Sequence, residues 1–123
     1  MTRENLRPIR AAVAILAVAS CLYLIQASAR IGFSRLLSRY ALISNSTAAA
    51  DAAITLSHSD PNAHHARATV LARLKQTAEA VKSLETATSL RPREDNLWLE
   101  LGHAREELGD SAGALAAFDQ AVR

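Results

Sequence analysis

The side chains best suited to metal binding or proton transfer in this sequence are those of its four histidines: His58, His64, His65 and His103. Neutral imidazole is a common metal ligand, and the group titrates near neutrality. His64 and His65 are neighbours in a predicted helix, so their side chains point about 100° apart and do not converge on one ion. We therefore interpret the histidines as solvated or packed side chains and predict no metal site.

Carboxylates and a single thiol are the remaining candidates for chemistry. Glu106, Glu107 and Asp110 cluster at a predicted helix end, where a solvated face is a simpler interpretation than an acid–base pair. Cys21 is the only cysteine, so neither an internal disulfide nor a Cys-based zinc site is available. We find no nucleophile motif and no glycine-rich phosphate loop. We predict that the protein is not an enzyme, with no catalytic residues, no cofactor and no small-molecule substrate.

Small and large apolar residues recur with a period of 34 residues. The clearest copy contains Trp98, Leu101, Gly102, Ala114, Phe118 and Ala121. The copy before it contains His64, Arg67, Ala68, Ala80, Leu84 and Ala87, and a degraded third contains Arg30, Phe33, Ser34, Ser46, Ala50 and Ala53. Alanine and glycine are expected where two helices cross closely, because a larger side chain would force them apart.

The period and the order Trp, Leu-Gly, Ala, Phe, Ala, Pro resemble the tetratricopeptide repeat (TPR). The resemblance implies an all-α fold, a short TPR-like α-solenoid of antiparallel helix hairpins. It implies repeats over 61–94 and 95–123 and a degenerate repeat over 30–58. Arg105 stands where the family usually has an aromatic residue, and Lys75 replaces the glycine that Gly109 supplies in the next repeat.

Local signals predict where these helices begin and end. Asp60-Pro61 starts a helix over 61–75, and Thr77 caps a helix over 78–90 that ends before Pro92. A helix from Asp95 closes near Gly109, and the last helix begins at Asp110 or Ser111. Upstream, the turn over 44–47 precedes a helix over 48–58.

The N-terminal segment reads as a membrane anchor. A basic tail over 1–10 precedes an uncharged run over 11–29, bracketed by Arg10 and Arg30. A helix of that length rises about 28 Å, close to the hydrocarbon thickness of a bilayer. We favour an uncleaved transmembrane helix. Two alternatives are a secretory signal cleaved after Ala29 and a lipoprotein signal that would make Cys21 the lipidated N-terminus.

The charge distribution bears on partners and topology. Residues 1–39 carry six Arg against one Glu, whereas 61–123 carry eight basic and nine acidic residues, so we predict no nucleic-acid partner. Residues 31–44 read as a basic amphipathic continuation of the anchor, either at the lipid headgroups or with its apolar face packed on the next repeat. The positive-inside rule gives a near tie, and the short tail favours repeats on the periplasmic side.

The resemblance also implies a binding site, since TPR ligands usually lie in the concave groove lined by the first helix of each hairpin. The corresponding residues here are Asn62, His65, Thr69, Arg73, Asn96, Leu99, His103 and Glu106. Ala66 and Glu100 stand where a clamp for a peptide carboxylate would need donors, so we predict no carboxylate binding.

Together these features predict a membrane-anchored protein–protein interaction module. We expect an accessory, assembly or scaffold subunit that passes once through a bacterial inner membrane by residues 11–29 and binds a protein or peptide. One alternative is a soluble secreted or periplasmic adaptor released by cleavage at Ala29. Another is a small structural subunit of a large membrane complex.

Overall fold

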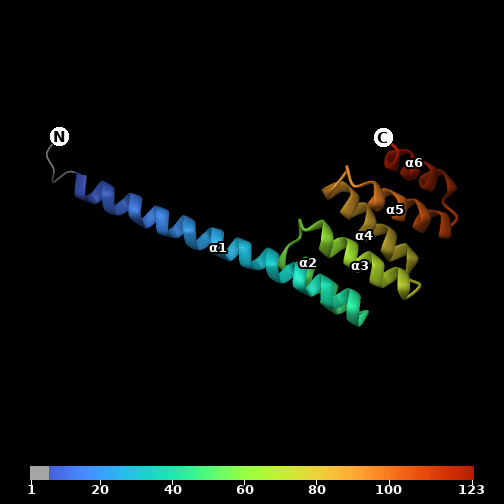
Figure 1. The fold of residues 1–123 in the computed structure, drawn as a ribbon, viewed down its shortest axis with the longest axis horizontal. Helices are drawn as coiled ribbons and strands as arrows, with labels where there is room; N and C mark the ends of the chain where they lie inside the picture. The colour runs from blue at the N-terminus through green and yellow to red at the C-terminus, as the bar shows by residue number, and fades with distance from the viewer. Residues whose placement is uncertain (1–5) are drawn as a thin grey trace. The chain divides into compact units, whose positions relative to one another are not determined.

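The computed structural model describes residues 6–123, with side chains from Ala12 onward. Its helices are α1 (Leu6–Ser44), α2 (Thr47–Leu56), α3 (Pro61–Arg73), α4 (Thr77–Leu90), α5 (Asp95–Glu107) and α6 (Ser111–Ala121), and the described residues form no strand (Figure 1). The side chains of the predicted basic tail over 1–10 lie outside the described part. The chain divides into two units, residues 1–30 and 31–123.

The first unit is the N-terminal part of α1. Helix α1 contains a stretch long and apolar enough to cross a membrane by length and composition, a test that a signal sequence also passes. Its large apolar side chains between Val13 and Ile25 are 60% to 72% exposed. A helix that is apolar on all sides is typical of a membrane span.

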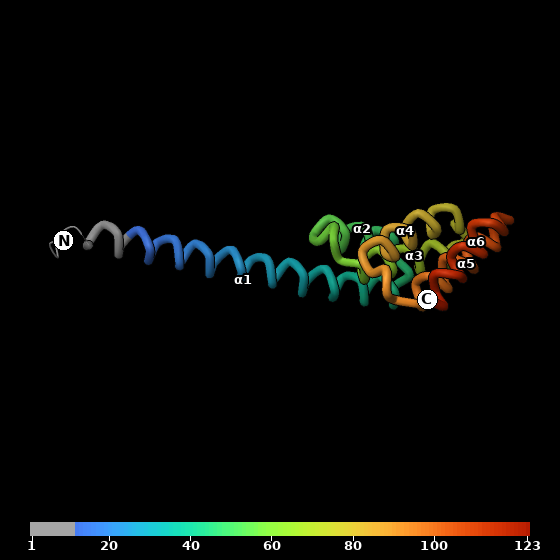
Figure 2. Tube along the Cα trace, turned by 90° about the horizontal axis from the view of Figure 1, so that it is seen from above, coloured from blue at the N-terminus to red at the C-terminus, as the bar shows by residue number. Residues whose placement is uncertain are grey.

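The second unit is a row of helix hairpins. Helices α2 to α6 each pack on the next helix in the chain (Figures 1 and 2). The predicted all-α architecture of antiparallel hairpins is confirmed. Predicted and observed helix ends agree to within two residues: α2 ends at Leu56 and α3 at Arg73.

The helix caps follow the local signals with one exception. Asp60 accepts a hydrogen bond from the Asn62 amide at 3.0 Å, and Asp110 accepts one from the Gly113 amide at 2.9 Å. The predicted cap at Thr77 is wrong. The N-cap residue of α4 is Gln76, and Thr77 lies buried in the first turn.

The turns inside the two hairpins share one backbone conformation. Lys75 has φ 62° and Gly109 has φ 80°, so both occupy the left-handed region. Glycine adopts this region without strain, whereas in lysine the Cβ atom makes this conformation less favourable. The replacement of glycine by Lys75 therefore leaves the turn geometry unchanged.

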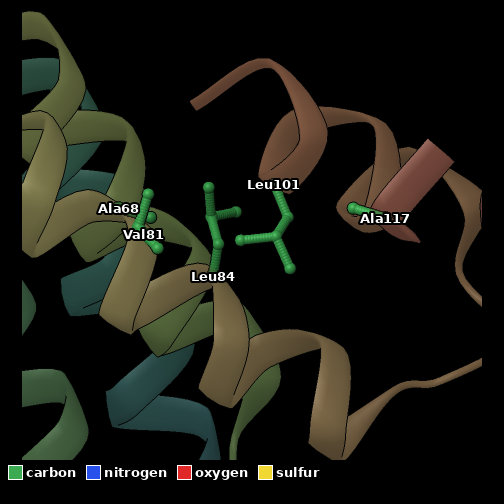
Figure 3. Packing of buried hydrophobic residues seen from close by; sticks show 5 residues of the cluster. All are labelled: Ala68, Val81, Leu84, Leu101 and Ala117. Carbon is green, nitrogen blue, oxygen red and sulfur yellow. The ribbon is translucent and has the colours of Figure 1, made fainter. Parts of the chain in front are cut away.

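Each hairpin is held by close helix crossings. A Cβ added at Gly102 would overlap the ring of Phe118, so only glycine fits beside this ring. At the equivalent position of the preceding repeat, Ala68 is 1% exposed. Side chains of Val81, Leu84, Leu101 and Ala117 complete the cluster with Ala68, and Figure 3 shows Leu84 and Leu101 pointing toward one another.

An equivalent hydrogen bond recurs between the two repeats. The indole Nε1 of Trp98 donates to the carbonyl of Pro92 at 2.9 Å. One repeat earlier, Nε2 of His64 donates a hydrogen bond to the carbonyl oxygen of His58 at 2.8 Å. His64 therefore takes the structural place of the tryptophan.

The degenerate repeat packs through small residues. Ser34 is fully buried, and its Oγ lies 3.0 Å from the carbonyl oxygen of Ala53 and 3.3 Å from Oδ2 of Asp60. Ala41 of α1 packs with Ala50 of α2 and Val70 of α3. The face of α1 that packs on the repeats is thus its small face. Leu42 of α1 packs against the same cluster, whereas Phe33, Leu36, Tyr40 and Ile43 are exposed.

We expect Leu101→Ala to lower the free energy of unfolding by about 3 kcal/mol, because it removes a fully buried side chain and leaves a cavity. The matched control is Leu99→Ala on the same helix, where the native leucine is 40% exposed, and its cost should stay below about 1 kcal/mol. Urea titrations followed by the fluorescence of Trp98, the only tryptophan, measure both. Equal losses in the two variants would contradict the assignment of Leu101 to the core.

Candidate functional site

An open groove of about 630 Å³ runs across the second unit. Helices α3 and α5 form its sides, and α4 forms part of its floor. Its lining residues are Leu42, His65, Ala68, Thr69, Ala72, Arg73, Thr77, Ala80, Leu84, Glu100, His103, Ala104 and Glu107. The floor is made mainly of alanine and leucine, whereas polar side chains stand along the sides.

Four of the predicted groove residues line this groove: His65, Thr69, Arg73 and His103. Asn62 instead lines a neighbouring cavity of about 270 Å³, together with residues of α1 that include Arg35 and Arg39. Three predicted residues line neither cavity: Asn96, Leu99 and Glu106. Glu106 lies beside the groove, where its Oε2 is 3.7 Å from Nδ1 of His103.

Two acidic side chains also line the groove, and of these only Glu107 was not predicted. Glu107 stands 34 residues after Arg73, so the repeat period itself points to it. Glu100, which stands 35 residues after His65, is a groove position that the family resemblance implies, and its negative charge argues against a carboxylate clamp. A periodic alignment predicts equivalent positions, but it does not reveal that His65 and Glu100 meet across the groove.

The contact between His65 and Glu100 joins the two sides of the groove. Nε2 of His65 lies 2.9 Å from Oε2 of Glu100 and donates its hydrogen to the carboxylate. This hydrogen bond, with the negative charge of Glu100, raises the pKa of His65 above its ordinary 6.5, while partial burial opposes the rise. The hydrogen bond between His65 and Glu100 therefore links α3 to α5.

Arg73 is held at the other end of the groove by a helix end. Its guanidinium Nη1 donates to the carbonyl of Leu42 at 2.7 Å. This carbonyl belongs to the last turn of α1, where carbonyl groups lack partners within the helix. Arg73 therefore satisfies a free acceptor of α1 and keeps a positive charge at the groove.

A polar cluster outside the groove ties three helices together. Arg67 of α3 donates to Asp51 of α2 and to Ser83 of α4, each at 2.7 Å. Arg105 likewise donates to Glu85 at 2.8 Å and to the carbonyl of Gly113 at 3.0 Å. These arginines have structural partners, so we assign them to packing. The described residues contain no group of three or more His, Cys, Asp or Glu side chains arranged to hold a metal.

The geometry of the groove suits binding of an extended or helical peptide segment. Ala72 and Ala104 offer apolar contact, and Thr69, His103 and Glu107 offer hydrogen-bonding groups. Recognition sites typically combine an apolar surface with a small number of placed polar groups.

The raised pKa of His65 predicts a pH-dependent stability. A folded-state pKa above the unfolded value makes the imidazolium stabilising below about pH 6.5, and this contribution is lost as pH rises through the raised value. Because His65 and Glu100 are 37% and 47% exposed, we expect less than about 1 kcal/mol. An NMR titration of the His65 ring should return toward the ordinary pKa in Glu100→Gln. An unchanged titration would contradict the contact.

Comparison with known proteins places this geometry in a family. The family model described as "Tetratricopeptide repeat" matches residues 61–94 and 95–123. Among solved structures, a mutant of MamA is similar with a TM-score of 0.65 and 19% identity, covering 74% of this chain and 69% of that chain, which supports the fold alone. No curated protein sequence matches significantly. Because the two matched segments cover more than half of the chain, the protein belongs to the tetratricopeptide repeat family.

Proposed function

We propose that this protein is a membrane-anchored protein–protein interaction module, an accessory, assembly or scaffold subunit at a bacterial inner membrane. The repeats make it a protein-interaction module, and the anchor is the further step. One observation carries that step: helix α1 joins a membrane-length apolar stretch to the repeat unit within one continuous helix.

The residues of the anchor support a spanning helix. The run over 11–29 has no charged side chain, and Arg10 and Arg30 stand at its two ends. In water the exposed apolar side chains between Val13 and Ile25 would be unfavourable, whereas in hydrocarbon they are solvated. We propose that the repeats lie on the periplasmic side, because a basic segment followed by an apolar run has the layout of a signal sequence.

The anchor would hold the groove close to the membrane surface, where partner proteins can bind it. A chain fixed in the membrane raises the local concentration of its groove near other membrane-bound proteins, so a modest affinity suffices for assembly. We propose that a protein or peptide segment lies across α3 and α5, with apolar side chains on Ala72 and Ala104. His65, Thr69, Arg73 and His103 would hydrogen-bond its polar groups, and Asn62, Asn96, Leu99 and Glu106 would contact its flanks.

Two other functions use the same residues differently. Cleavage after Ala29 would release a soluble secreted or periplasmic adaptor with the same groove. A structural subunit of a large complex would use the anchor itself to pack against other spanning helices, and a stable assembly would then copurify in detergent. Lipidation of Cys21 is a further route to the membrane.

Cys21 gives a direct test of the anchor. In intact membranes we expect Cys21 to resist a membrane-impermeant maleimide and to react after detergent is added, because it lies inside the apolar run. In a Cys21→Ser chain, Ser111→Cys should react in cells whose outer membrane alone is permeable. N-terminal sequencing is the control. A mature start at Arg30, or immediate labelling of Cys21, would refute the anchor.

A bulky charge in the groove tests the site. We expect Ala72→Arg to weaken partner binding by about tenfold or more, since its side chain would fill the groove. Ala78→Arg on α4 is the matched control, because Ala78 is exposed and does not line the groove. Quantitative pull-downs from solubilised membranes compare the two. Equal recovery of partners with both variants would argue against the groove.

A further inference from the structure

The second part of α1, residues 31–44, has two different faces. Ser34, Ser38 and Ala41 are buried against the repeats. Away from this face stand four large apolar side chains that are 59% to 85% exposed: Phe33, Leu36, Tyr40 and Ile43. A row of aromatic and aliphatic side chains beyond the membrane span is costly unless another surface covers it.

The spacing of this row matches the seam of a coiled coil. Steps of three, four and three residues separate its members, which is the alternation of a and d positions in a heptad. The same register continues upstream without a break through Ala29, Gln26, Leu22, Ala19, Ile15 and Ala12. Gln26 is the only one of these ten positions without an apolar or aromatic side chain.

Lipid does not account for the whole row. A helix rises about 1.5 Å per residue, so Ile43 lies roughly 21 Å beyond Ala29 along α1. The headgroup layer is only about 5 to 8 Å thick, and even a tilt of about 40° leaves Ile43 well outside it. Tyr40 and Ile43 therefore need a protein surface to cover them.

Gln26 indicates what that surface is. Its amide is exposed on α1 within the apolar run, where hydrocarbon offers it no hydrogen-bond partner. Polar side chains in spanning helices commonly bond to an equivalent group on a neighbouring helix. In a symmetric parallel pair, Gln26 at an a position meets Gln26 of the second copy. A single buried amide at such a position also fixes the register.

We infer that two copies of this chain pair in parallel along the a and d row of α1, from Ile15 to Ile43. The part of this seam before residue 30 rests on the proposed membrane anchor. The part from Phe33 to Ile43 does not depend on that proposal. The repeats pack on the opposite face of α1, so the seam and the repeat contacts do not compete.

The charges near the row are compatible with pairing. Arg30, Arg35 and Arg39 fall at e, c and g positions, so none occupies the seam itself. In the parallel register, Arg39 faces Ser44 of the second copy and Arg30 faces Ile25 of the second copy. No arginine therefore stands opposite another arginine across the seam.

Cysteine cross-linking in native membranes tests the pairing on the full chain. In a Cys21→Ser background, we expect Leu36→Cys and Tyr40→Cys to form disulfide dimers on mild oxidation. Arg35→Cys and Arg39→Cys, one residue away on the same exposed helix, are matched controls and should give roughly tenfold less dimer. The unmodified chain, whose single Cys21 is at a c position, is a separate control that should also stay monomeric.

Gln26→Leu tests the amide. The leucine side chain has a volume similar to that of glutamine but cannot form the interchain hydrogen bond. We therefore expect the association constant of the dimer in detergent to fall about threefold to tenfold. Ser28→Leu, a polar residue of the same run at a c position, should leave the constant unchanged. Equal effects of the two variants on the association constant would contradict the assignment of Gln26 to the seam.

The outcomes separate this inference from the membrane anchor. If alkaline extraction leaves the chain in the membrane but Leu36→Cys and Tyr40→Cys cross-link no better than the controls, the pairing is wrong and the anchor stands. If the chain is extracted as a soluble protein and these two cysteines still cross-link selectively, the anchor is wrong and the pairing of residues 33–43 stands. A cross-linked product with a mass other than twice the chain would identify a different partner and overturn the inference.

Discussion

The structure depends on close helix crossings that only small residues permit. Gly102 lies against Phe118, Ala68 belongs to the core cluster with Leu84, and Ser34 lies buried beside the carbonyl of Ala53. A larger side chain at these positions would push the helices apart, and the loss would spread to each following repeat because every hairpin packs on its neighbour.

The groove follows from the same crossings. Small side chains on α3 and α4 let the backbones approach and leave a low floor, while the longer side chains of α3 and α5 rise on either side. Only one side-chain pair spans this space, His65 with Glu100, among the hydrogen bonds of the described residues that link α3 to α5. A groove with an apolar floor and polar sides is a surface for a protein segment rather than a chamber for chemistry.

Helix α1 serves two environments with one continuous backbone. Its first unit carries apolar side chains all round, and its continuation buries small side chains such as Ser34 and Ala41 under the repeats. Using small residues for that contact leaves Phe33 and Tyr40 free on another face. The chemical character of α1 thus changes along its length and around its circumference, which suits an element that joins a membrane, an interaction module and a second chain.

Sequence alone determined the helices, their approximate ends and the hairpin order, because caps, prolines and the 34-residue period are local or periodic signals. It also identified four of the groove residues. The tertiary structure alone decided that His65 meets Glu100 across the groove and that Leu99 and Glu106 do not line it. One step along a helix rotates a side chain by about 100°, so the packing of neighbouring helices, which no local pattern encodes, selects the residue that faces inward.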